Sequence, residues 1–213
     1  MALLASPHRS NTQHGRSMIE MLGVLSIVGI LSIAGISELG KILSRHKTMK
    51  TIETFTQLVQ DVLIQKRAFR TIPEGYTSQM SLAISEAGLL PSGWEYKNQK
   101  LYNNMGYAMF YNKNNQIQIN YTMTGKNAIL SGSNKELCRM FFTNFAIPFE
   151  TSIKSVAVYQ GSKSIGYWYG DNYCTQTQNC LKNITIPDIE KQCSICAKNE
   201  DYVCAFVIFF PFD

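Results

Sequence analysis

Hydrophobic and polar positions follow a different pattern in each of three segments of the chain. Residues 1–15 are mostly polar, whereas residues 16–72 carry a continuous apolar run and then apolar residues at helical spacing. Residues 73–213 combine short alternating and short helical patterns with a long polar stretch. We therefore expect a leader peptide in 1–15, a long N-terminal helix in 16–72 and a globular head in 73–213.

The long helix is predicted by its periodicity and by the absence of a breaker. No proline lies between Pro7 and Pro73, and Pro73 ends the pattern. A helix from Arg16 to about Arg70 would be about 80 Å long at 1.5 Å per residue, which is rare in soluble globular domains. Beyond the apolar run, the apolar residues fall largely on one stripe, which contains Ile42, Met49, Ile52, Phe55, Val59, Val62 and Ile64.

The apolar run from Met21 to Ser37 contains about 17 residues, the lower limit for a helix that crosses a bilayer. We expect residues 16–37 to form a transmembrane helix. Glu20 stands immediately before the run, where a carboxylate fits a cleaved secretory signal poorly and requires a partner inside a membrane. The alternative is an uncleaved signal anchor with Glu20 at the level of the lipid headgroups.

The head is expected to combine short helices with an antiparallel sheet. Its predicted elements are a helix beginning near Ser78, a hairpin of 107–112 and 116–123 around Asn114-Asn115, a helix over 135–145, and strands over 155–160 and 202–210. The last strand is nearly all apolar, so we expect it inside the sheet. The stretch from Gly161 to Asp201 is polar and is predicted to be a long loop that needs cross-links.

Composition excludes several classes of protein. The chain is not disordered, since 45% of its 213 residues are apolar and only 16% are charged. Its net charge of +5 is not clustered, so we expect no nucleic-acid partner. The histidines are His8, His14 and His46, which excludes His-dependent catalysis and His-ligated metals in residues 47–213. Paired-carboxylate and Gly-rich phosphate motifs are also missing, so we expect neither an enzyme nor a cofactor.

Six cysteines are gathered near the C-terminus of the chain. They are Cys138, Cys174, Cys180, Cys193, Cys196 and Cys204. In an exported protein such a set predicts structural disulfides, and sequence alone does not choose their pairing. One alternative is a four-thiolate zinc site built from Cys193, Cys196, Cys174 and Cys180, and another is a redox pair at Cys193 and Cys196. We expect disulfides, and therefore no metal site.

An aromatic cluster lies within the polar stretch, at Tyr167, Trp168, Tyr169 and Tyr173. Tyrosine and tryptophan are favoured at interfaces, so the cluster predicts an adhesive or subunit-contact surface. The same residues are also accounted for by packing of the loop onto the sheet.

The start of the chain resembles the type IV prepilin family. The resemblance is carried by Gly15, then Arg16-Ser17-Met18-Ile19-Glu20-Met21, and then the apolar run. It implies that a prepilin peptidase cuts between Gly15 and Arg16, that the new amine is methylated, and that Glu20 becomes the fifth residue of the mature chain. In this family the first mature residue is usually Phe, Met or Leu, whereas here it is Arg16.

The resemblance also implies an architecture and a function. The fold would be α+β, with a long N-terminal helix packed on an antiparallel sheet and a disulfide-stapled C-terminal region. The long helix would be the spine of the subunit, first in the membrane and then in the filament. The chain would be a homo-oligomeric pilus subunit, inserted into the bacterial inner membrane as a precursor and polymerised into an extracellular filament by inner-membrane assembly machinery. Glu20 would pair with the mature amine of a neighbouring subunit and set the register between subunits.

The head suggests a subclass. The short helix between Ser78 and Pro91, followed by Ser92-Gly93-Trp94 and the turn Asn103-Asn104-Met105-Gly106, resembles the head of type IVb pilins. A minor pilin or a type II secretion pseudopilin stays open. That likeness implies a bridge that clasps the C-terminal region, for which Cys138 with Cys204 is our expectation. The alternative function is a membrane-anchored extracytoplasmic thiol–disulfide or binding protein that uses Cys193 and Cys196.

Overall fold

The computed structural model describes residues 18–75, 79–123, 133–197 and 204–212. At residues 20, 30–37 and 133 it describes the backbone but not the side chain. The chain divides into two compact units, Met1–Leu43 and Ser44–Asp213. The predicted leader and its cleavage site, Gly15 and Arg16, lie outside the described residues.

The first helix, α1, runs from Met18 to Ile64 and agrees with the helix predicted from the apolar and amphipathic patterns. It is interrupted at Gln65, whose φ of −100° and ψ of 14° depart from helical values. A four-residue helix, α2, follows at Lys66–Phe69. Helix α2 therefore ends close to Arg70, where the helix was predicted to end. The break at Gln65 was not indicated by the sequence pattern.

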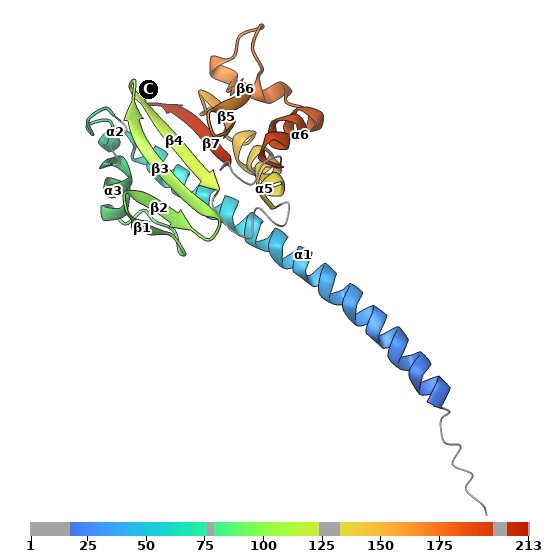
Figure 1. Ribbon diagram of the computed structural model, residues 1–213. Helices are drawn as coiled ribbons and strands as arrows, with labels where there is room; N and C mark the ends of the chain where they lie inside the picture. The colour runs from blue at the N-terminus through green and yellow to red at the C-terminus, as the bar shows by residue number, and fades with distance from the viewer. Residues whose placement is uncertain (1–17, 76–78, 124–132, 198–203, 213) are drawn as a thin grey trace, which may run out of the picture. The chain divides into compact units, whose positions relative to one another are not determined.

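The second unit contains a seven-stranded antiparallel sheet in the order β1-β2-β3-β4-β7-β5-β6 (Figure 1). The strands are β1 Glu95–Lys97, β2 Lys100–Asn103, β3 Gly106–Lys113, β4 Gln116–Met123, β5 Ser155–Gln160, β6 Lys163–Tyr169 and β7 Cys204–Pro211. The last strand in sequence, β7, pairs with both β4 and β5. The prediction that this apolar strand lies inside the sheet is confirmed.

Shorter helices and turns complete the second unit. They are α3 Gln79–Glu86, α5 Ser133–Phe141, a π-helical turn at Phe142–Ala146, α6 Ile186–Ser194, and 3₁₀ turns at Asp171–Tyr173, Leu181–Asn183 and Ile195–Ala197. Helix α3 lies beside β1 and β3, whereas α6 lies against α5 near β5 (Figure 1). The α+β class and the antiparallel sheet are thus as predicted.

One face of the sheet packs on the second half of α1. Phe55 on α1 lies with its ring centroid 5.2 Å from Tyr121 and 5.0 Å from Phe145. Phe141 stacks on Phe206 of β7 at 3.8 Å. Burial alternates strictly along β7, as expected for a strand with one face in the core. The amphipathic half of α1 is therefore the part that organises the head.

The hairpin of β3 and β4 forms where the sequence predicted it. Asn114 and Asn115 both have positive φ, at 52° and 56°, and the closing pair is Lys113 with Gln116. Two positive φ values in a two-residue loop define the turn that matches strand twist, and asparagine tolerates that conformation. A local signal was sufficient here because both partners lie next to the turn.

The predicted long loop at 161–201 is wrong, because this stretch contains both β6 and α6. Strand β6 is an edge strand with mostly exposed or half-buried side chains, so it lacks the alternation that identifies strands. Helix α6 begins with a capping box in which the Thr185 hydroxyl accepts from the Asp188 N–H. Pro187 lies in the first turn of this helix, where proline is tolerated. Those residues are a readable start signal. The two-stranded β1–β2 hairpin was also not predicted.

Candidate functional site

The helix of the first unit leaves its apolar side chains uncovered. Eight large apolar residues between positions 18 and 28 are each 53–85% exposed, namely Met18, Ile19, Met21, Leu22, Val24, Leu25, Ile27 and Val28. At about 100° per residue these positions point to every side of the helix. A helix that is apolar all round requires other chains or lipid around it. We call residues 18–28 the apolar segment.

Further exposed apolar residues lie near the end of the first unit. Leu39, Ile42 and Leu43 are each about 60% exposed. Between them, Lys41 Nζ lies 2.7 Å from Glu38 Oε1 in a solvated ion pair of little energetic weight. Among the described residues, no helix is both long enough and apolar enough to cross a membrane.

The residues predicted for processing and assembly are placed only in part. Glu20 lies in α1, two residues after its start, but its side chain is not described. Gly15 and Arg16 lie outside the described residues. Glu20 therefore lies within the apolar segment, and the exposed apolar side chains around it are what the structure adds to the motif.

All six cysteines lie in described residues, and all six form disulfides. The bridges are Cys138–Cys193, Cys174–Cys180 and Cys196–Cys204, with Cα–Cα distances of 5.6, 5.5 and 5.4 Å. The first joins α5 to α6 across 55 residues of sequence, and the second closes a small loop. The prediction that the C-terminal region is held by disulfides is confirmed.

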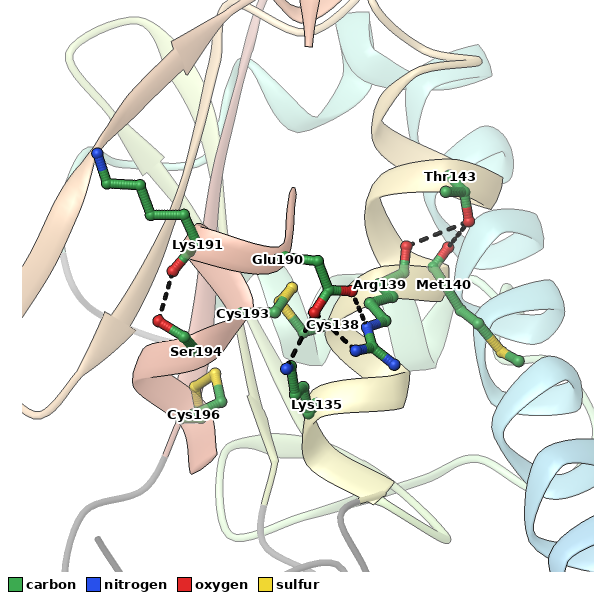
Figure 2. Close-up of a disulfide and its surroundings, with 11 residues drawn as sticks. Lys135, Cys138, Arg139, Met140, Thr143, Glu190, Lys191, Cys193, Ser194 and Cys196 are labelled. Carbon is green, nitrogen blue, oxygen red and sulfur yellow. Dashed lines mark hydrogen bonds and ion pairs between the residues drawn. A yellow bond between two sulfur atoms is a disulfide. The ribbon is translucent and has the colours of Figure 1, made fainter. Parts of the chain in front are cut away.

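The expected bridge between Cys138 and Cys204 is wrong. Helix α6, which was not predicted, lies against α5 and brings Cys193 opposite Cys138 (Figure 2). Cys204 begins β7 and bonds instead to Cys196, which follows α6 by two residues. The pairing depends on an element whose presence sequence reasoning missed.

The same bridges bear on the zinc and redox alternatives. Cys193 and Cys196 each bond to a different partner, so they form neither a Cys-x-x-Cys disulfide nor a pair of free thiolates. Both are largely buried. Within the described ranges, no group of three or more His, Cys, Asp or Glu residues is arranged to hold a metal ion.

An ion cluster ties α5 to α6 beside the first bridge. Glu190 on α6 accepts from Arg139 Nη2 at 2.6 Å and lies 2.9 Å from Lys135 Nζ (Figure 2). Hydrogen bonds, first from Arg139 and then from Lys135, lower the pKa of Glu190 to about 2. The carboxylate is therefore ionised at neutral pH. Sequence offered no signal for this cluster, because Arg139 and Glu190 are 51 positions apart.

The aromatic cluster divides between the two faces of β6. Trp168 is buried in the core, as the packing interpretation required. Tyr167, on the opposite face, shares a hydrogen bond of 2.5 Å with Tyr159 on β5. Burial and then that bond raise the pKa of Tyr167 to about 12. Tyr173 is 36% exposed, so the predicted contact surface stays a prediction that involves only the tyrosines.

The molecule thus presents two candidate features: the uncovered apolar segment of the first unit, and a sheet domain whose C-terminal region is held by three disulfides. Within the ranges that the structure describes, neither feature contains an arrangement of groups typical of a catalytic centre. No protein-family profile, no curated protein and no solved structure matches the chain.

Proposed function

We propose that this chain is a structural subunit of a type IV pilus-like filament, made as a membrane-inserted precursor. A prepilin peptidase cleaves it between Gly15 and Arg16, and inner-membrane machinery polymerises it into an extracellular fibre. One observation carries the proposal: the motif from Gly15 to Glu20 leads directly into a helix whose apolar side chains are exposed on every side.

The apolar segment is unfavourable in water and has to be covered by lipid or by protein. Covering a large aliphatic side chain contributes about 1.5–3 kcal/mol, so covering these eight partly exposed residues is worth on the order of 10 kcal/mol. Before assembly the segment is covered by lipid, and afterwards by the same segment of neighbouring subunits. Transfer from one apolar environment to the other costs little, which makes polymerisation out of a membrane feasible.

Glu20 gives this apolar association a register. A carboxylate among apolar helices is costly unless a cation pairs with it. Cleavage after Gly15 creates such a cation, the amine of Arg16, on every subunit. Pairing of this amine with Glu20 of a neighbour fixes how far one helix slides along the next.

The disulfide-held head suits an exposed position outside the cytoplasm. Disulfides persist in oxidising compartments, and this chain has all six of its cysteines paired. The second unit has its own core and sheet, so it stays folded while the first unit exchanges lipid for protein.

The alternative, an anchored thiol–disulfide protein, needs Cys193 and Cys196 to form one reversible bond. Their bonds to Cys138 and Cys204 weigh against it. Counting free thiols in the unfolded, unreduced chain separates the two. The filament proposal expects none, whereas a reactive pair at these positions supports the alternative.

Processing is the direct test of the proposed class. N-terminal sequencing and intact mass are measured on chains from cells with and without a prepilin peptidase. The mature chain is expected to begin at Arg16 only when the peptidase is present, and Gly15→Leu is expected to block cleavage.

A second glycine provides the matched control. A Cβ at Gly23 meets nothing within 4 Å, so Gly23→Ala is expected to be processed like the wild type. A mature chain that begins elsewhere, or one that is cut without the peptidase, contradicts the proposed function.

A further inference from the structure

The outer side of β6 is one of the two edges of the sheet. In the order of the strands β6 stands last, and in the described part of the chain it pairs along its length only with β5. The edge of a sheet carries backbone N–H and C=O groups that a strand of another chain can bind, so proteins cover it or charge it. The proposed filament function gives this edge no role.

The first half of β6 is poorly suited to pairing. Lys163 is exposed, and the register between β5 and β6 shifts between Ala157 and Tyr159. Opposite that shift, Gly166 has a φ of 136°, a conformation that other residues rarely adopt. A charge and an irregular register both discourage a second strand from pairing with an edge.

The second half of β6 is covered by the chain that follows it. After leaving β6 at Tyr169, the chain returns at Asn179 and Cys180, and Cys180 forms a parallel bridge with Tyr169. The Tyr169 N–H donates to the Asn179 carbonyl at 2.8 Å. The returning segment therefore occupies, at this residue, the place that the next strand of the sheet would take.

Two interactions close the returning segment on itself. The Cys174–Cys180 disulfide joins positions that are 6 residues apart and forms a small loop, which we call the guard loop (residues 174–180). Outside it, Lys182 Nζ lies 2.5 Å from Asp171 Oδ1, which joins the residues before the guard loop to those after it. Cys180 is buried, so the guard loop is anchored at the end that meets β6.

The disulfide contributes most of this attachment. The ion pair between Asp171 and Lys182 joins side chains that are 37% and 51% exposed, and such pairs contribute little. A single backbone hydrogen bond also contributes little against the entropy of an ordered loop. The side chains of residues 175–179 are exposed, so their burial does not hold the loop. The covalent bridge is thus what keeps the guard loop compact enough to stay at the edge.

We propose that the guard loop protects the edge of β6, and that without the Cys174–Cys180 bridge this edge pairs with β6 of a second copy of the chain. Two identical strands that pair antiparallel are related by a two-fold axis, so the contact closes as a dimer. The proposal concerns the second unit alone and does not depend on cleavage or on filament assembly.

A second copy of β6 is the partner that this edge fits. In an antiparallel overlap of two β6 strands, Lys163 of each copy lies opposite Tyr169 of the other, so the two lysines stay at opposite ends of the pair. A parallel overlap would place the lysines side by side, where like charges repel. Ile165 is 40% exposed and comes close to Tyr167 of the second copy, and pairs of branched and aromatic side chains favour strand association.

The test compares the full-length wild type in detergent with the double variant Cys174→Ser and Cys180→Ser. Hydrogen–deuterium exchange is followed in peptides that cover β6, at a low and a high protein concentration. In the wild type we expect the Tyr169 amide to be protected at both concentrations. In the double variant we expect it to exchange about tenfold faster or more at low concentration, because the hydrogen bond to Asn179 is lost. At high concentration we expect β6 to regain protection, since its edge then pairs.

Light scattering at the same concentrations is expected to show more dimer for the double variant than for the wild type. Association through the apolar segment is common to both chains, so only the difference between them counts. Gln176→Ala is the matched control, because it changes an exposed side chain of the guard loop and keeps the bridge. We expect it to behave as the wild type. Ile165→Lys, added to the double variant, places a further charge on the edge and is expected to abolish the dimer.

Circular dichroism checks that each variant is folded. Should the double variant fail this check, Lys182→Gln carries the test, with an expected increase of about twofold in the exchange rate of the Tyr169 amide. Unchanged exchange of this amide in the folded variant that carries the test overturns the proposal. Faster exchange of the double variant without renewed protection at high concentration overturns it too, because the released edge then accepts no second copy.

Discussion

Apolar side chains are exposed in the first part of α1 and buried in the second part. In the first unit Leu22 and Leu25 are 67% and 64% exposed, whereas in the second unit Leu58 and Val59 are fully buried. Propensity does not distinguish these positions, since all four lie in one helix. What differs is the sheet, which covers the second half of the helix. The comparison shows that the head has a core of its own, whereas the apolar segment leaves its described apolar side chains exposed.

The largest effect on the head is expected from its longest disulfide. Removing Cys138–Cys193 as the double variant Cys138→Ala and Cys193→Ala frees a loop of 55 residues, and the chain-entropy relation gives a loss of about 4 kcal/mol in the free energy of unfolding. Denaturant unfolding followed by tryptophan fluorescence measures it, since both tryptophans lie in the second unit.

The short bridge provides the control for that change. Removing Cys174–Cys180, with a separation of 6 residues, is expected to cost about 2 kcal/mol by the same relation. Equal losses from the two double variants would show that the bridge between α5 and α6 is not what holds the C-terminal region.

A matched pair of leucines tests the comparison itself. Leu58→Ala opens a cavity in the core and is expected to lower the free energy of unfolding of the head by about 2–5 kcal/mol. Leu25→Ala removes an exposed side chain from the first unit and is expected to change head stability by less than about 0.5 kcal/mol. A similar loss in both variants would contradict the independence of the head.

The smallest effect concerns pH. The folded pKa of Glu190 is about 2, against an ordinary value of 4.5, so its stabilising contribution is complete above about pH 5 and is lost as the pH falls toward 2. The difference in unfolding free energy between wild type and Glu190→Gln is expected to shrink over that window. A difference in unfolding free energy that stays constant from pH 7 to pH 2 would show that the Glu190 ion cluster does not stabilise the head.

Local signals in the sequence were sufficient for much of the fold. The hairpin at Asn114-Asn115 and the helix with Gly88 beyond its end are encoded by neighbouring residues, and both were predicted. Gly88 has a φ of 69°, the conformation that ends helices and that glycine adopts freely. The strand β7 was predicted inside the sheet because its sequence is nearly all apolar.

What escaped prediction depends on contacts between distant residues. The short β1–β2 hairpin and the edge strand β6 have few buried positions, so their patterns are weak. The disulfide pairing and the Glu190 cluster both follow from α6 packing on α5. The capping box at Thr185 would have predicted the helix α6 that carries Cys193, but not its packing on α5. Of the apolar segment, the sequence predicted only the motif and the apolar residues. Whether their side chains are covered depends on how the rest of the chain packs.

The central claim is that the apolar segment assembles and that Glu20 sets its register. The most direct measurement is the yield of sheared filaments, confirmed by electron microscopy, from cells that express the wild type, Glu20→Gln or Glu38→Gln. Glu38 is the matched control, because it is a second glutamate of the same helix with an exposed ion pair to Lys41. We expect filaments at normal yield from wild type and Glu38→Gln, and a severe loss from Glu20→Gln with the monomer still folded. Normal yield from Glu20→Gln, or no filaments from the wild type, would contradict the account.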